Sequence, residues 1–169
     1  VELIIADSPS IPRSELKEAK ALVQERNWEL TILYTHEIDK PEYQANSGDR
    51  CYYCKSELFS EMANYAREKD IRTLAYGAIL DDLSDHRPGA KAAEEYAVIA
   101  PLQILSKEEI RELSRERKLP TASRASFACI ASRLPRGEKV TVQKLSQIEM
   151  AEEILKEKNF YQYRARHHG

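Results

Sequence analysis

The stretch that decides the fold is Leu3-Ile4-Ile5-Ala6-Asp7-Ser8-Pro9-Ser10-Ile11-Pro12, which runs from an apolar segment through a polar turn into a helix start. A short apolar run bounded by Asp, Ser and Pro is typical of a buried strand, and a proline in the first turn suits a helix entry. Apolar residues then recur at helical spacing through residue 23, and a β-rich run follows at 30–34. Strand, helix and strand in close succession predict a parallel pair.

The same alternation continues along the chain. We expect helices over 55–68, 90–96, 106–117 and 141–158, and short strands over 72–76 and 98–100. The sequence Ser106-Lys107-Glu108-Glu109 is a capping box that opens the third of these helices. The pattern predicts an α/β domain over 1–138, with a parallel sheet covered by helices on both faces. Residues 139–169 are expected to begin a small α+β domain.

Composition excludes several classes of protein. The 169 residues are 42% hydrophobic and 32% charged, which suits one globular domain with a short extension. Lys and Arg total 26 against 28 Asp and Glu, so the basic excess of a nucleic-acid-binding protein is absent. No apolar run is long enough for a membrane span, and no signal segment opens the sequence. We therefore expect a cytoplasmic protein without a membrane partner. The chain starts with Val1 and ends in a strand-like stretch, so we expect it to be an internal piece of a longer protein.

Three cysteines form the first candidate site. Cys51-x-x-Cys54 is expected at a loop-to-helix junction, where a helix N-terminus lowers the pKa of a thiol, and Cys129 lies in a second irregular stretch. If the two stretches meet, three thiolates converge. They could hold a [4Fe-4S] cluster and leave one iron without a protein ligand, or bind zinc together with a histidine. The candidate histidines are His36, His86, His167 and His168. A reduced C-x-x-C near an unrelated buried Cys129 is the simpler alternative.

Two charged motifs form further candidates. Arg164 and Arg166 alternate on an expected strand, so both point to one face, as in a carboxylate or phosphate clamp; a solvated edge strand is the alternative. An acidic loop follows the strand at 72–76, where α/β sheets bind ligands. It could hold Mg²⁺ or be a solvated turn, and it contains Asp81, Asp82 and Asp85. Glu152 is expected opposite the apolar stripe of its helix or at its border.

Four motifs resemble the LarE family of ATP-dependent sulfur transferases, within the PP-loop ATP pyrophosphatase superfamily. They are the D-R-C-Y-x-C-K-x-x-L-F segment at 49–59, the Gly77 to Gly89 loop, the A-C-I-A-S-R-L-P-x-G segment at 128–137, and R-x-R-H-H-G at 164–169. They occur in the family's order across nearly the whole chain. The family's S-G-G-x-D-S phosphate loop, which should precede the first strand, is not in this sequence, so we expect the domain to be incomplete at its N-terminus and to bind ATP weakly.

The resemblance implies a PP-loop fold and a cofactor-building reaction. The implied substrate is pyridinium-3,5-biscarboxylic acid mononucleotide, whose carboxylates are adenylylated by ATP and Mg²⁺ and converted to thiocarboxylates for the nickel-pincer cofactor of lactate racemase. Sulfur would be carried by a [4Fe-4S] cluster on Cys51, Cys54 and Cys129. The enzyme is expected to be a homo-oligomer that acts on a small nucleotide and not on nucleic acid.

The resemblance also implies roles for single residues. Cys129 and Glu152 would be catalytic, Glu152 as an acid/base or positioning residue. Substrate would be bound by Ser132, Arg133, Arg164 and Arg166, and ATP by Gly77, Asp81, Asp82, Asp85 and Arg87. Two alternatives remain: a tRNA thiolation enzyme of the same superfamily, which the acidic balance disfavours, and a zinc-stabilised binding module without catalysis.

Overall fold

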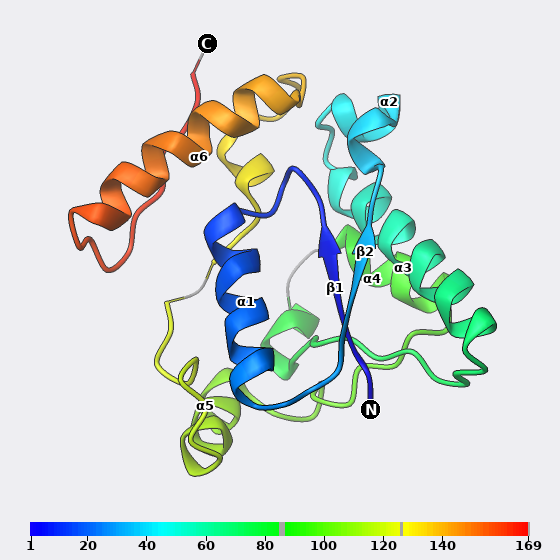
Figure 1. Cartoon of the computed structure of the whole chain (residues 1–169). Coiled ribbons are helices and arrows are strands. Elements are labelled where there is room, and N and C mark those ends of the chain that lie inside the picture. Colours follow the sequence, from blue (N-terminus) through cyan, green and yellow to red (C-terminus); the bar gives the residue numbers. More distant parts are fainter. Residues whose placement is uncertain (85–86, 126, 169) are drawn as a thin grey trace.

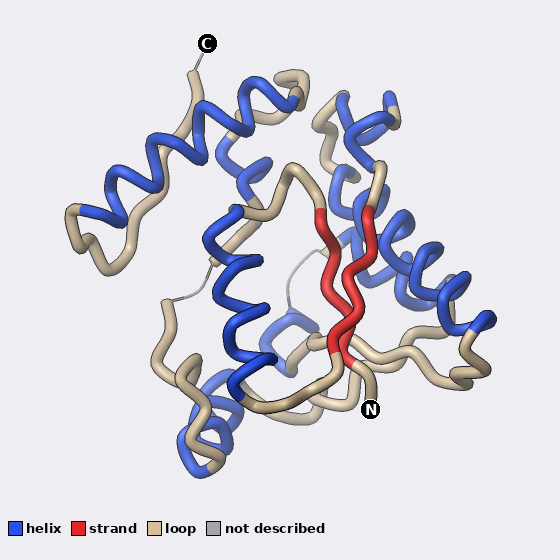
Figure 2. Tube along the Cα trace, in the orientation of Figure 1, coloured by secondary structure: helices blue, strands red, loops and turns tan. Residues whose placement is uncertain are grey.

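The computed structural model describes residues 1–84, 87–125 and 127–168. Strands β1 (Leu3–Asp7) and β2 (Leu30–Tyr34) are parallel, with Leu3 opposite Leu30 and Asp7 opposite Tyr34. Helix α1 (Arg13–Glu25) connects them. The expected α/β fold with a parallel sheet is confirmed in this unit, which Figure 2 shows at the centre of the molecule.

The rest of the expected sheet is smaller than the sequence suggested. In the described part of the chain, the runs at 72–76 and 98–100 meet in a single parallel bridge between Ala75 and Ile99. Tyr76 N donates to Ile99 O at 3.0 Å, and Ile99 N donates to Leu74 O at 2.9 Å. Pro101 follows at once and has no N–H with which to extend a ladder. The described residues therefore form two strands and one bridge where four strands were expected.

Helices cover both sides of the strands. Figure 1 shows α1 on one side and α3 (Arg50–Glu68) with α4 (Pro88–Glu95) on the other. The stretch 36–50 contains the 3-10 helix η1 (Glu37–Asp39) and α2 (Pro41–Gln44). Further along are η2 (Leu80–Ser84), α5 (Lys107–Glu116), η3 (Ile130–Arg133) and α6 (Val142–Glu157). The capping box of α5 is confirmed: Ser106 N donates to Glu109 Oε2 at 2.7 Å, and Glu109 N donates to Ser106 Oγ.

Two clusters of buried side chains form the core. The first packs Phe59 and Met62 of α3 against Ala92 and Ala93 of α4, and the strands contribute to it. The second, which we call the cysteine-side core, consists of Tyr43, Ile130, Ala131, Leu134, Val140, Leu145 and Ile148. Its members come from both sides of residue 138. Helix α6 therefore shares a core with the preceding region.

The C-terminal segment after α6 is extended but is not part of a sheet in the described residues. It folds back along α6, and the two lie side by side in Figure 1. Its backbone bonds to side-chain and main-chain atoms around η3 and α6 instead of to a neighbouring strand. Among the described residues, no helix is both long and apolar enough to cross a membrane.

Candidate functional site

The C-x-x-C motif lies inside a helix and not before one. Helix α3 begins at Arg50, earlier than the expected start at residue 55, so Cys51 and Cys54 both belong to its first turns. Cys51 is exposed, and Cys54 and Cys129 are half-buried; all three are free thiols. The helix starts early because this turn is packed from both sides: Tyr52 contacts the first core, and Tyr53 contacts the cysteine-side core.

Two of the three cysteines share one environment. Cys54 and Cys129 both pack against the cysteine-side core. Burial, with smaller contributions from the nearby Glu37 and Cys129, raises the pKa of the Cys54 thiol to about 12. The expected lowering of this pKa by the helix N-terminus is therefore wrong, since desolvation outweighs the helix dipole. In this state Cys54 is protonated at neutral pH.

The third cysteine is exposed and lines a cavity. Cys51 lines this cavity with Lys55 and Gly77, and in the described part of the chain no three His, Cys, Asp or Glu side chains form a ready metal-binding group. Two histidines of the zinc alternative have acidic neighbours: His36 Nδ1 lies 3.8 Å from Asp39, and His167 Nδ1 lies 3.1 Å from Glu138. Convergence of all three thiols therefore stays a prediction, while the approach of Cys54 to Cys129 is observed.

Arg50 and Asn46 hold the Cys129 segment against α3. Arg50 Nη1 donates to Ala131 O and to Asn46 Oδ1, both at 2.7 Å. Buried Asn46 in turn donates from its side-chain Nδ2 to Pro135 O at 2.7 Å, and its main-chain carbonyl accepts from Gly137 N at 3.0 Å. We call this group the Arg50 latch. Because a buried carbonyl without a donor is costly, the latch fixes the position of the Cys129 segment relative to Cys54.

Breaking the latch should separate the two thiols. In a Cys51→Ala background, which leaves a single reactive pair, we expect Arg50→Ala to slow dibromobimane cross-linking of Cys54 to Cys129 at least tenfold, roughly the cost of one charge-assisted bond. Arg50→Lys should give an intermediate cross-linking rate, because lysine keeps the positive charge but lacks the forked N–H donors of the guanidinium. The control is Arg72→Ala, at an exposed arginine. An unchanged rate in Arg50→Ala protein of normal melting temperature would show that the latch does not position Cys129.

A buried ion pair lies behind the Cys129 segment. Arg133 Nε donates to Glu152 Oε1 at 2.8 Å and Nη2 donates to Oε2 at 3.2 Å, with the two residues 2% and 5% exposed. Arg133 Nη1 donates to the carbonyls of Ala128 at 2.7 Å and Cys129 at 3.1 Å, and to Ser132 Oγ at 2.9 Å. All three guanidinium nitrogens are thus engaged within the protein. The expectation that Glu152 lies at or beyond the border of the apolar stripe is wrong, because it faces Arg133 from beside the buried Ile148.

The same ion pair anchors the arginine segment. Ala165 N donates to Glu152 Oε1 at 3.0 Å, and His167 N donates to Arg133 O at 3.2 Å. Residues 163, 165 and 167 are half-buried, whereas Arg164 and Arg166 are exposed. The alternation expected of a strand is therefore present without a sheet, and both arginines lie on the outward side of the segment.

The acidic loop is tied down by its own carboxylates. Asp82 Oδ1 pairs with Arg87 Nη2 at 2.7 Å, and its Oδ2 accepts from Ile79 N at 3.0 Å. Asp81 Oδ2 accepts from the backbone N of Lys107, the first residue of α5, at 2.9 Å. Asp85 and His86 lie outside the described residues. The two described aspartates therefore organise the loop around its neighbours.

A cavity of about 610 Å³ joins the acidic loop to the cysteine motif. Its lining includes Cys51 together with Gly77, Asp82 and Arg87, three of the residues expected to bind ATP. We call it the loop cavity. It lies beyond Tyr76, at the carboxyl end of the bridged run, which is where α/β sheets bind ligands.

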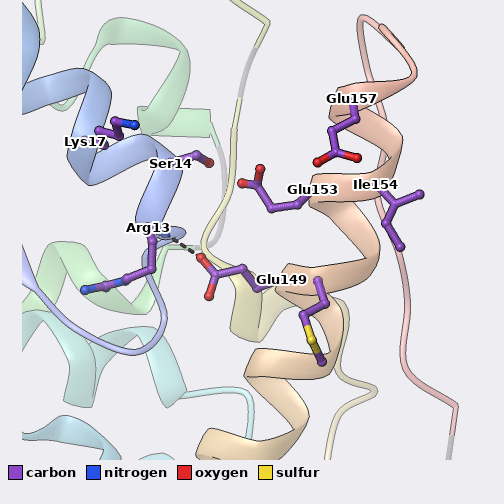
Figure 3. A pocket seen from close by; sticks show the side chains of 8 residues that line it. Arg13, Ser14, Lys17, Glu149, Glu153, Ile154 and Glu157 are labelled. Carbon is purple, nitrogen blue, oxygen red and sulfur yellow. Dashed lines mark hydrogen bonds between the residues drawn. The ribbon is translucent and has the colours of Figure 1, made fainter.

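A second cavity, of about 690 Å³, lies between α1 and α6 (Figure 3). Its lining includes Arg13 and Lys17 of α1 and Glu149, Glu153 and Glu157 of α6. Arg13 N donates to Glu149, whereas the Arg13 guanidinium points away from α6 and pairs with Asp7. None of the expected site residues lines this cavity. The larger of the two cavities is therefore not the one that the candidate site residues line.

Sequence reasoning missed a polar cluster at the carboxyl ends of both strands. After β1, Ser8 donates to Glu37 and Ser10 is hydrogen-bonded to Tyr43; both partners follow β2. Glu37 is 1% exposed, and among the described residues its Oε2 has no hydrogen-bond partner. Ile130 N donates to Ser10 O at 2.9 Å, which joins the cluster to the cysteine segment. Their position after parallel strands was the signal that could have found them.

No protein-family model matches the sequence. The chain is 38% identical over 165 residues to an uncharacterized protein of Synechocystis sp., which covers 96% of this chain and 62% of that protein. It is 25% identical over 155 residues to an uncharacterized protein of Methanocaldococcus jannaschii, with 90% of this chain and 59% of that protein covered.

One relative carries an informative name. The chain is 26% identical over 171 residues to the pyridinium-3,5-bisthiocarboxylic acid mononucleotide synthase of Lactiplantibacillus plantarum, with 100% of this chain and 62% of that enzyme covered. The chain thus spans about three fifths of the length of each of these relatives. It is similar, along all its residues, to an enzyme that makes a thiocarboxylated mononucleotide, and this supports the resemblance to the LarE family.

Proposed function

We propose that this chain provides the sulfur-transfer site of an ATP-dependent enzyme that converts a carboxylate of a pyridinium mononucleotide into a thiocarboxylate. The observation that carries the proposal is the shared anchor of Cys129 and the arginine segment. The Arg133–Glu152 pair binds the carbonyl of Cys129 through Arg133 and the backbone N–H of Ala165 through Glu152. A candidate cluster ligand and a candidate anion clamp are thereby anchored to one buried ion pair.

The proposed chemistry has two balanced steps. A substrate carboxylate oxygen attacks the α-phosphorus of ATP, and pyrophosphate leaves. A sulfur nucleophile then attacks the resulting acyl carbon and AMP leaves, so that a C–S bond replaces a C–O bond. In this proposal Mg²⁺ and ATP lie in the loop cavity, lined by Gly77, Asp82 and Arg87.

Cys51, Cys54 and Cys129 would hold a [4Fe-4S] cluster. All three are free thiols, and Cys54 and Cys129 pack against the same core. The cluster would supply sulfur in a form that can leave the protein without consuming a cysteine. Cluster binding requires the Cys54 proton to be displaced, because burial otherwise keeps that thiol neutral.

Charge and burial divide the other residues into two groups. Buried Arg133 and Glu152 position the Cys129 segment, with Ser132, whose Oγ donates to Cys129 O at 2.7 Å. Exposed Arg164 and Arg166 bind the phosphate or carboxylates of the substrate, since two guanidiniums on one side of an extended segment can form several charge-assisted bonds. Glu152 is thus assigned a positioning role within the proposed site.

The arginine clamp provides the test. We expect Arg164→Ala and Arg166→Ala each to lower thiocarboxylate formation at least tenfold, because each charge-assisted bond contributes roughly 1.5–3 kcal/mol. Lysine at either position should restore only part of the activity. Melting temperature and iron content should not change, and the control is Arg67→Ala, at an exposed arginine of α3. Full activity in either alanine variant would contradict the clamp, and a parallel loss of iron and stability would make the arginines structural.

A further inference from the structure

Lys55 is a cation of the loop cavity that no part of the proposed function uses. It lines the cavity with Cys51, Gly77 and Arg87. It stands one helical turn after Cys51 on α3. Its Nζ lies 5.7 Å from the centre of the Phe59 ring and 6.0 Å from that of Tyr76. The side chain is half-buried, and these two rings fix its direction.

Lys55 makes no ion pair with an acidic residue in the described part of the chain. Asp82, in the same cavity, pairs with Arg87 at 2.7 Å. Glu94 also lines the cavity but does not pair with Lys55. A partly desolvated ammonium that contacts only aromatic faces is stabilised when an anion binds next to it. The cavity therefore offers an anion a positive charge that needs no rearrangement of existing pairs.

The start of α4 is built to hold this lysine in place. A Cβ on Gly89 would lie 2.9 Å from Lys55 Cγ and 3.4 Å from the carbonyl oxygen of Cys51. Only glycine allows α4 to approach α3 this closely without moving one of them. The close approach places the start of the Lys55 side chain between α4 and the turn that carries the cysteines, and its Nζ lies over the Phe59 and Tyr76 rings.

We propose that Lys55 binds a phosphate group of a nucleotide in the loop cavity, next to Cys51. The identification of the anion as a nucleotide phosphate rests on the proposed function; the anion site itself rests on the cavity, its unpaired ammonium and Gly89. The phosphate could belong to ATP or to the mononucleotide substrate, and both present the same chemistry to a lysine. In either case the bound nucleotide lies beside the first cysteine of the C-x-x-C motif.

Calorimetry with three probes tests the site: inorganic pyrophosphate, ATP, and nicotinic acid mononucleotide as a carboxylated pyridinium nucleotide. We expect Lys55→Gln to weaken binding of at least one probe tenfold or more, about the contribution of one charge-assisted bond. Lys55→Arg should bind within about threefold of the unaltered protein because the charge is kept. The matched control is Lys91→Gln: Lys91 also lies over a ring, 5.3 Å from the centre of Tyr52, but it pairs with Glu95 at 3.9 Å and does not line the cavity.

Gly89→Ala gives an independent check, since it should weaken binding of the same probe without changing any charge. A loss confined to pyrophosphate and ATP would identify ATP as the source of the phosphate, and a loss confined to the mononucleotide would identify the substrate. Equal affinity of Lys55→Gln and the unaltered protein for all three probes, or no binding by either, would overturn the proposal. These readouts require no sulfur transfer, so a protein that binds phosphate through Lys55 but forms no thiocarboxylate would refute the proposed function alone.

Discussion

Cys129→Ala protein is expected to form no detectable thiocarboxylate and to retain less than a tenth of the bound iron, while melting within a few degrees of the unaltered protein. Two remaining thiols are too few to hold a cluster of the proposed kind. The fold should survive because the segment is held by other groups: Arg50 binds the carbonyl of Ala131, and Arg133 binds those of Ala128 and Cys129. None of these bonds uses the thiol.

Cys51→Ala and Cys54→Ala extend this experiment. All three variants should lose iron and activity together if one cluster uses all three thiols. Iron and acid-labile sulfide are measured on protein purified without oxygen, alongside thermal unfolding. Unaltered iron in Cys129→Ala protein would remove Cys129 from the metal site, and stoichiometric zinc without sulfide would favour the zinc-stabilised module over the cluster.

Arg133→Met is expected to destabilise the protein by about 3–5 kcal/mol, the usual cost of leaving one member of a buried ion pair without its partner. The variant removes both bonds to Glu152 and leaves the Ala128 and Cys129 carbonyls without this donor. Glu152→Leu should cost a comparable amount, because Arg133 would then stay buried and charged. The free energy of unfolding in urea measures both effects.

The double variant Arg133→Met/Glu152→Leu provides the sharper result. With both charges gone, no uncompensated ion remains, so the double variant should be more stable than either single variant. The exposed pair Lys91–Glu95 is the control, and breaking it should cost less than about 1 kcal/mol. A double variant whose loss equals the sum of the single losses would show that Arg133 and Glu152 act independently.

Local signals predicted the elements of this fold better than their pairing. Alternation of apolar runs located β1, α1 and β2, and the Ser106 capping box located the start of α5, since each depends on residues close in sequence. The runs at 72–76 and 98–100 were expected to be full strands and form a single bridge. The number of ladder bonds depends on neighbours in space, which periodicity does not report.

In the candidate site too, the sequence predicted which residues matter better than how they pack. Motif order marked the cysteines, Arg133, Glu152 and the arginine pair, and the structure brings several of them to one place. It could not indicate that Glu152 is buried against Arg133, because a glutamate beside an apolar stripe is usually exposed. It also missed Glu37 and the Arg50 latch, whose partners are between 4 and 91 residues away in sequence. Buried polar contacts of this range are decided by tertiary packing.

The most direct test of the account is one reaction carried out without oxygen. The full-length protein, and not the 169-residue chain alone, which we expect to bind ATP weakly, is incubated with ATP, Mg²⁺, sulfide and pyridinium-3,5-biscarboxylic acid mononucleotide. The products are identified by mass spectrometry. The account predicts a thiocarboxylated mononucleotide, with one AMP and one pyrophosphate released for each sulfur incorporated. AMP and pyrophosphate without sulfur in the product, or an unchanged mononucleotide with protein whose three cysteines are occupied by the cluster, would contradict it.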